Sequence, residues 1–186
     1  KPTVKRVIMR SIVDDTTRIA ALKTGEADIV MQVPYQKIAE VRKTTGLKTV
    51  RLFPSGSSVF MVYKHQSAQT PWSDPRVRAA MSYAIDKKAI TERLLRGAVG
   101  TFGFLARGDL GYDPTIYPYE YNPAKARQLL QQAGYGGGFS LDLPYIAGAV
   151  TGVKETAEAV ALYLRQVGIN ATPRALEGPE FVQFVM

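Results

Sequence analysis

The chain of 186 residues contains no cysteine and a single histidine, His65. Without cysteine there are no disulfide bonds, no thiolate metal ligands and no cysteine nucleophile. One histidine makes a histidine-based metal site or a Ser-His-Asp triad hard to build. No glycine-rich loop ends in the Gly-Lys-Ser or Gly-Lys-Thr that binds nucleotide phosphates. The sequence therefore predicts a protein that is not an enzyme, with no catalytic residues, no metal ligands and no cofactor.

Long apolar runs are also missing, since no stretch approaches the ~18–20 residues of a membrane span. The first ten residues, KPTVKRVIMR, lack the apolar stretch of a secretory signal peptide. We therefore expect a chain that was processed or is an internal piece of a longer protein. The hydrophobic content of 46% and charged content of 22% are those of a globular protein.

The positive charge of the chain is unevenly distributed. Residues 1–62 carry 11 Lys and Arg against 5 Asp and Glu, whereas residues 63–186 carry 13 against 11. A basic surface can attract nucleic acid or an anionic membrane. No block of five or six like charges occurs, so a solvated surface is the simpler interpretation. A basic α/β module that binds nucleic acid, or a solute-sensing domain of a transcription regulator, is the alternative function.

The first third of the chain alternates between strand-like and helix-like segments. Asp14 and Gly25 supply start and stop signals for one helix, and Pro34 and Gly46 do so for a second. Segments rich in Val and Ile lie on either side of these helices. The predicted strands are 4–12, 27–33 and 47–53, and the predicted helices are 16–24 and 35–45. Such alternation predicts helices that cover one sheet.

The remainder continues the alternation after a break near Pro54 to Ser57, where proline and glycine interrupt the pattern. The predicted elements are a strand at 58–63, a helix at 124–134, a strand at 141–146, a helix at 153–167, a strand at 169–176 and a helix that begins at 179. We therefore expect a second α/β region.

Residues 74–97, DPRVRAAMSYAIDKKAITERLLRG, are the most informative segment. Asp74 is a helix N-cap, Pro75 occupies the first helical position and Gly97 ends the pattern. Asp86 interrupts the apolar stripe and can start a new turn, so two helices are as compatible with the pattern as one. Arg76 and Arg78 point away from the stripe, and we expect one of them to reach a carboxylate or a helix end rather than a ligand.

The sequence pattern of this segment, D-x-R-V-R-x-A-x-x-Y-A-I-D, resembles the signature of the solute-binding proteins of family 5, the peptide and nickel type. Three other segments resemble the same family in the right order. They are T-R-x-A-A-L-K-T-G-E-A-D-I-V near residue 20, N-P-A-K-A-R-Q-L-L-Q-Q-A-G-Y from Asn122, and L-x-x-x-G-I-N before residue 171. At Asn122 the family usually has Asp, and both residues cap helices well.

The resemblance implies a fold class. The chain is expected to be an α/β fragment of a two-lobed periplasmic binding protein type II clamp, with mixed sheets flanked by helices. Residues 1–56 are expected to form part of lobe 1, with the order βαβαβ. Residues 57–186 are expected to form most of lobe 2, which is incomplete at its C-terminal end.

The resemblance also implies a function, the capture of a peptide or similar small solute for an ABC importer. The expected partners are that ligand and the permease subunits in the membrane, with no nucleic acid. The complete protein is expected to be a periplasmic monomer whose precursor carries a signal peptide. The ligand, a peptide, nickel chelate, opine or sugar, stays open.

The ligand-binding residues that match the family are Ser55, Gly56, Ser57 and Ser58. Small residues at the crossover between lobes leave main-chain groups free to pair with an extended peptide. An ordinary turn is the alternative interpretation of these four residues.

Overall fold

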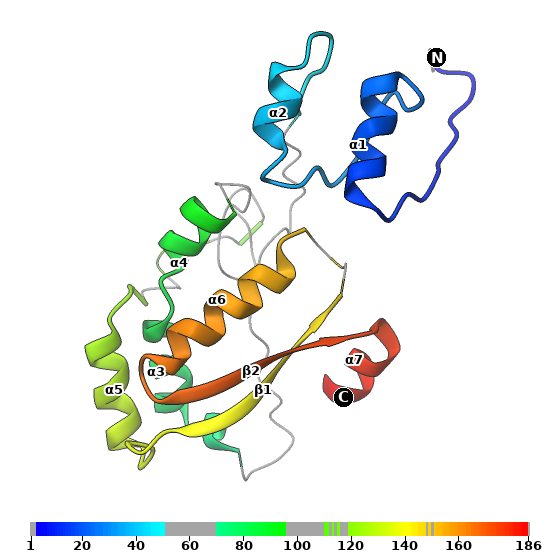
Figure 1. Ribbon diagram of the computed structural model, residues 1–186. Coiled ribbons are helices and arrows are strands. Elements are labelled where there is room, and N and C mark those ends of the chain that lie inside the picture. The colour runs from blue at the N-terminus through cyan, green and yellow to red at the C-terminus, as the bar shows by residue number, and fades with distance from the viewer. Residues whose placement is uncertain are drawn as a thin grey trace. The chain divides into compact units, whose positions relative to one another are not determined.

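The computed structural model describes residues 3–50, 70–95, 110, 111, 113, 115, 119–147, 149 and 151–185 (Figure 1). The chain divides into two compact units, Lys1–Val50 and Arg51–Met186. Each unit is described by itself. The expected division into lobes at residue 56 falls outside the described residues and stays a prediction.

The first helix of the N-terminal unit confirms its predicted start and stop signals. Helix α1 spans Asp15–Thr24. The Asp14 carboxylate accepts a hydrogen bond from the Thr17 backbone N–H at 2.8 Å, and Gly25 adopts the left-handed conformation with φ of 78°. Gly25 can do so because it has no Cβ.

Helix α2, Ile38–Lys43, is shorter than the predicted helix 35–45. The Lys37 N–H donates to the Pro34 carbonyl at 2.8 Å, which makes the first residues a turn rather than α-helix. Glu40 accepts from both Lys37 and Lys23, so its carboxylate ties α2 to α1. These hydrogen bonds, above all the one from Lys23, lower the pKa of Glu40.

The predicted strands 4–12 and 27–33 are wrong, because residues 3–50 contain no strand in the structure. Residues 47–50 of the third predicted strand are not in a strand either, and residues 51–53 lie outside the described residues. Among the described residues, no backbone hydrogen bond joins these three segments to one another. Val and Ile favour extended backbone, but a strand forms only where a second segment supplies hydrogen-bond partners.

The C-terminal unit begins its described part with the 3-10 turn η1, Pro71–Ser73, and helix α3, Pro75–Ala84. The helical pattern then breaks at Ile85 and restarts as α4, Lys87–Ala89, and the π-helical turn η2, Ile90–Leu94. The Asp86 carboxylate accepts from the Ala89 N–H at 2.8 Å. Of the two alternatives that the sequence left open, the structure has two helices, and Asp86 caps the second.

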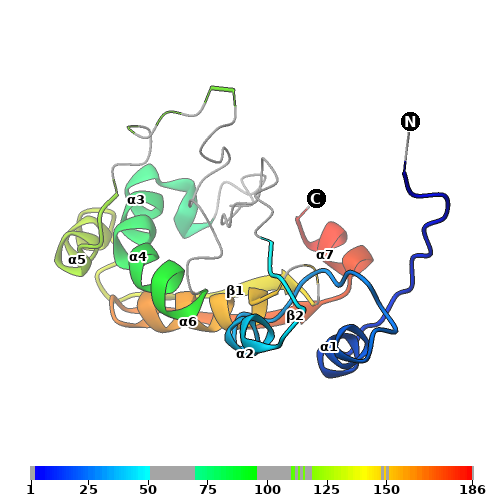
Figure 2. The same ribbon diagram turned by 90° about the horizontal axis from the view of Figure 1, so that it is seen from above.

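Helix α5, Pro123–Gln132, packs beside α3, as Figure 2 shows from above. The Asn122 side chain accepts from the Lys125 N–H at 2.9 Å and caps α5. The contact between α3 and α5 buries apolar side chains from both helices. They are Val77, Ala80, Met81 and Ala84 from α3 and Ala126 and Leu130 from α5.

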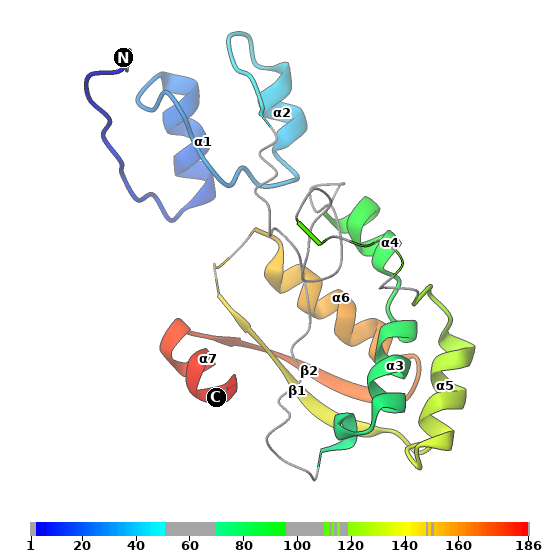
Figure 3. The ribbon, with the colours of Figure 1, turned by 180° about the vertical axis from the view of Figure 1, so that it is seen from behind.

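The end of the chain forms a strand–helix–strand unit. Strand β1, Phe139–Ile146, pairs in parallel with β2, Ile169–Leu176, and helix α6, Val153–Arg165, connects them. Figure 3 shows α6 lying along the two strands. Leu164 of α6 and Ile169 of β2 are fully buried. Helix α7, Gly178–Val185, follows β2. The predicted elements at 141–146, 153–167, 169–176 and 179–185 are confirmed within two residues at each end.

Candidate functional site

The four predicted ligand-binding residues, Ser55, Gly56, Ser57 and Ser58, lie outside the described residues. Their role stays a prediction. The single histidine, His65, also lies outside them. The described part of the chain holds no group of three or more His, Asp or Glu side chains placed to bind a metal ion.

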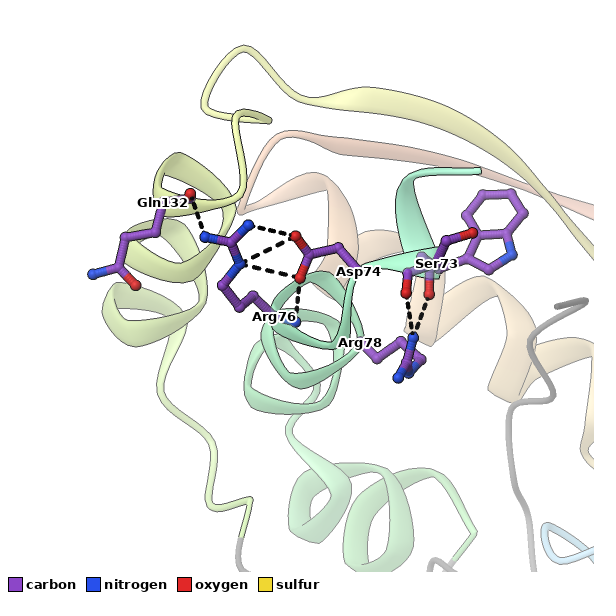
Figure 4. A network of polar contacts seen from close by, with 6 residues as sticks. Ser73, Asp74, Arg76, Arg78 and Gln132 are labelled. Atoms are coloured by element: carbon purple, nitrogen blue, oxygen red, sulfur yellow. Dashed lines mark hydrogen bonds and ion pairs between the residues drawn. The ribbon is translucent and has the colours of Figure 1, made fainter. Parts of the chain in front are cut away.

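The signature segment forms a polar network at the start of α3 (Figure 4). The Asp74 carboxylate accepts from the Arg76 backbone N–H at 2.7 Å and pairs with the Arg76 guanidinium at 2.6 Å. The hydrogen bond from the Arg76 side chain is the main cause of a lowered pKa at Asp74. Asp74 thus caps α3 and holds Arg76 at the same time.

Arg76 and Arg78 each donate to main-chain carbonyls at the end of an element. The Arg76 guanidinium donates at 2.8 Å to the carbonyl of Gln132, the last residue of α5. The Arg78 guanidinium donates to the Trp72 carbonyl at 2.8 Å and to the Ser73 carbonyl at 2.9 Å, at the end of η1. The expectation that an arginine reaches a carboxylate or a helix end is confirmed. The signature segment therefore holds α3, α5 and η1 together.

Three aromatic side chains connect this network to the strands. The Trp72 and Phe139 ring centroids lie 6.5 Å apart, and those of Tyr135 and Phe139 lie 5.5 Å apart in an edge-on arrangement. Such ring–ring contacts contribute more to stability than the burial of their apolar area alone would give. Trp72 thus packs against the beginning of β1.

A second polar and aromatic cluster lies between α3, α4 and α5, and the sequence patterns did not single it out. The Lys87 ammonium lies 5.6 Å from the Tyr119 ring centroid and donates to the Tyr119 carbonyl at 3.3 Å. The Lys125 ammonium lies over the Tyr83 ring, and Tyr83 contacts Tyr119 edge-on at 5.1 Å. Burial lowers the pKa of Lys87. The ammonium groups of both lysines already make cation–π contacts with aromatic rings, so we assign them a packing role rather than a ligand-binding one.

One open hollow of about 300 Å³ lies on the outer face of α6. Its lining residues, Ala159, Leu162, Tyr163 and Gln166, recur at helical spacing. The Tyr121 hydroxyl donates to the Gln166 side chain at 3.3 Å. Burial, followed by the charge of Asp86, raises the pKa of Tyr163. Small-molecule sites enclose most of the ligand surface, and this hollow is open to solvent, so its shape does not favour a small-molecule site.

Comparison with known proteins adds what the geometry alone does not give. The family described as bacterial extracellular solute-binding proteins, family 5 Middle, matches residues 1–184. The glutathione-binding protein GsiB of Escherichia coli O157:H7 is 30% identical over 176 residues, which are 95% of this chain and 34% of GsiB. The chain spans about a third of the length of the curated relatives that it matches.

Solved structures resemble the chain in fold. The periplasmic binding protein DppA from Helicobacter pylori, in complex with the peptide STSA, has a TM-score of 0.75 at 23% identity and covers 93% of this chain and 33% of its own. AgaA from A. tumefaciens R10, in complex with agropinic acid, has a TM-score of 0.70 at 28% identity and covers 92% and 35%. The predicted fold class, an α/β part of a type II periplasmic binding protein, is thereby confirmed.

Proposed function

This chain belongs to the bacterial extracellular solute-binding proteins, family 5, and we propose that it is part of the substrate-binding component of an ABC importer. The match over residues 1–184, together with relatives named as glutathione- and peptide-binding proteins, supports the proposal. In the proposed mechanism a peptide or similar small solute is enclosed between two lobes that close about a hinge. The permease subunits then receive it.

The geometry of the C-terminal unit fits a scaffold rather than a ligand contact. Asp74, Arg76 and Arg78 have their charged groups engaged by one another and by main-chain carbonyls. A binding protein that closes as two bodies needs each body to keep its shape. The signature residues serve that need by joining the ends of three elements.

Ser55, Gly56, Ser57 and Ser58 are the proposed ligand contacts. Their support is the family resemblance at the crossover and the small size of the side chains. A peptide main chain would pair with the main chain of these residues, so that the site accepts different side chains. Specificity would then come from pockets elsewhere in the complete protein.

The other parts of the proposal follow from the family. The complete protein would act outside the cytoplasmic membrane as a monomer, with no catalytic role. Among the described residues no helix is long and apolar enough to cross a membrane. The relatives GsiB and DppA are named as binding proteins. The net charge of +8 is the observation that suggested the nucleic-acid alternative. The relatives of the chain support solute binding instead.

The experiment measures ligand binding by the longer protein that contains this chain. Thermal shift and calorimetry against dipeptides, tripeptides, glutathione, an opine and a nickel–histidine complex should show one class that raises the melting temperature. The 186-residue chain alone should bind none of them below millimolar concentration. Failure of every solute class, with sequence-selective retention of duplex DNA at physiological salt, would support the nucleic-acid alternative instead.

A matched pair of variants tests the proposed contacts. Ser57→Trp should abolish solute binding by filling the space beside the main chain, while the melting temperature without ligand stays unchanged. Ser140→Trp, at an exposed position of β1, is the control and should bind as the parent does. Equal binding by the two variants would remove residues 55–58 from the site.

A further inference from the structure

Gln32 adopts a backbone conformation that is strained for its residue type. Its φ is 56°, and it is the single residue other than glycine with a positive φ in the part of the chain that the structure describes. In this left-handed region a Cβ atom crowds the main chain, whereas glycine has no Cβ and adopts it freely. The other described positions with positive φ are Gly25, Gly46, Gly111, Gly134, Gly138, Gly152 and Gly168. A glycine at position 32 would give the same bend, so the bend alone does not account for a glutamine there.

Arg18 of α1 holds the main chain at this bend. Its guanidinium donates to the Gln32 carbonyl at 3.0 Å. Because that carbonyl belongs to the peptide group directly after Gln32, the hydrogen bond fixes the direction in which the chain leaves the bend. The same guanidinium donates to the Ile12 carbonyl at 2.8 Å and pairs with the Asp15 carboxylate. The bend is thus tied to α1 and to the segment that precedes it.

The position of Arg18 is itself costly. Its side chain is 15% exposed, and its Nε atom is buried with no hydrogen-bond partner within the described residues. A buried donor that stays unpaired destabilises the folded state. The N-terminal unit therefore loses stability twice, at the Arg18 Nε atom and at the Gln32 backbone, for one local geometry. Residues held in strained conformations cluster at ligand-binding sites, where the surrounding structure fixes them in advance.

We propose that Gln32 is a solute contact of the binding protein and that Arg18 is the positioning residue that fixes it. The inference rests on the proposed function, because it assigns a residue to the solute site of that protein. A carboxamide has two N–H donors and one carbonyl acceptor and carries no charge. It therefore suits the amide and carboxylate groups of a peptide main chain. The fixed backbone sets the direction in which the Gln32 side chain leaves the main chain, which lowers the ordering cost of binding.

The test uses the longer protein that contains this chain, with glutathione, dialanine and trialanine as probes in calorimetry. Gln32→Gly removes the side chain and the strain together. The melting temperature without solute should stay at or above that of the parent, whereas the affinity for the bound probe should fall about tenfold or more. Gln32→Ala should lose the same affinity, because it lacks the carboxamide too. A residue with a purely structural role would not lower affinity while stability is kept.

Gln36→Gly is the matched control. Gln36 is an exposed glutamine in the turn that follows the bend, and its φ is not positive. This variant should bind the probe as the parent does. An equal loss of affinity in Gln36→Gly and Gln32→Gly would overturn the proposal, since the effect would not depend on the strained position.

A double-mutant cycle tests the positioning role of Arg18. Arg18→Met removes the hydrogen bond to the Gln32 carbonyl, so it should weaken probe binding when Gln32 is present. It should weaken binding much less in the Gln32→Gly background, because the side chain that it positions is gone. Far-ultraviolet circular dichroism checks that the variants keep their helices. Additive losses of affinity would overturn the positioning role.

Failure of this inference is distinguishable from failure of the proposed function. If the parent binds a probe and Gln32→Gly binds it with the same affinity, the inference is overturned and the proposed function stands. If the parent binds none of the solute classes named under the proposed function, that function fails and the assignment of Gln32 fails with it.

Discussion

Gly138 and Gly168 approach each other so closely that a Cβ atom on Gly138 would lie 2.0 Å from the Gly168 carbonyl oxygen. Both have positive φ, 78° at Gly138 and 92° at Gly168. They stand directly before the first pair of the parallel register, Phe139 and Ile169. The two strands therefore begin at a point where only main-chain atoms fit.

Gly138→Ala should destabilise the C-terminal unit by at least about 2 kcal/mol, because it combines a backbone clash with a strained φ. Gly137→Ala is the control, since a Cβ there meets no atom within 4 Å, and it should stay within ~0.5 kcal/mol of the parent. The measurement is the urea midpoint followed by circular dichroism. Equal midpoints for the two variants would show that the strands can separate at this point without cost.

The lowered pKa of Asp74 predicts a pH dependence of stability. The folded state favours the charged carboxylate, so the stabilisation is present above the ordinary value near 3.8 and is lost as pH falls below it. Asp74→Asn keeps an acceptor for the helix cap but removes the charge. Its unfolding midpoint should therefore fall less steeply than that of the parent between pH 5 and pH 3.

The control for this pH dependence is Asp142→Asn on β1, because no hydrogen bond or ion pair is described for the Asp142 side chain within the described residues, and the side chain is exposed. Asp142→Asn should leave the slope of the parent unchanged. A slope for Asp74→Asn that matches the parent would mean that other carboxylates carry the acid sensitivity.

Val77→Asp should unfold or strongly destabilise the C-terminal unit. Val77 of α3 has no exposed surface and lies in the contact between α3 and α5. A buried carboxylate without a partner costs several kcal/mol, roughly 3–5. Gln128→Asp, on the exposed face of α5, is the control and should melt as the parent does. A cooperative melt of Val77→Asp at the parent's temperature would show that this face of α3 is not part of the core.

The cap of α5 should tolerate the residue that the family usually has there. Asn122→Asp keeps the acceptor for the Lys125 N–H, so its stability should match the parent. Asn122→Ala removes the acceptor and should lower stability by about 1 kcal/mol. Denaturant midpoints measure both. Loss of stability in Asn122→Asp equal to that of Asn122→Ala would mean that the amide N–H₂ of Asn122, and not its oxygen, is what matters.

Local signals in the sequence were enough to locate most helices. Asp14, Asp74, Asp86 and Asn122 each cap the helix that the sequence predicts after them. A cap works through the N–H groups two or three residues ahead, so its energy is local and its position can be read from the sequence. The same holds for Gly25, where the left-handed conformation is a property of one residue.

Some of the predicted strands are present in the structure and others are not. The strands at 139–146 and 169–176 were predicted within two residues at each end. They pair because α6 between them brings the two segments together. Residues 4–12 and 27–33 are also rich in residues that favour strands, but they form no strand. Composition favours extended backbone in both cases, but pairing depends on a partner that the sequence of the segment itself does not specify.

By itself the sequence determined where the capped helices begin, the α/β class of the C-terminal unit and, through four segments in order, the family. Only the tertiary structure decided what the signature residues do, because the partners of Arg76 and Arg78 include the Gln132 and Trp72 carbonyls. Gln132 is 56 residues away from Arg76 along the chain. A cap is an interaction between neighbours in sequence, whereas these bonds and the approach of Gly138 to Gly168 exist only after the chain has folded and brought distant main-chain atoms together.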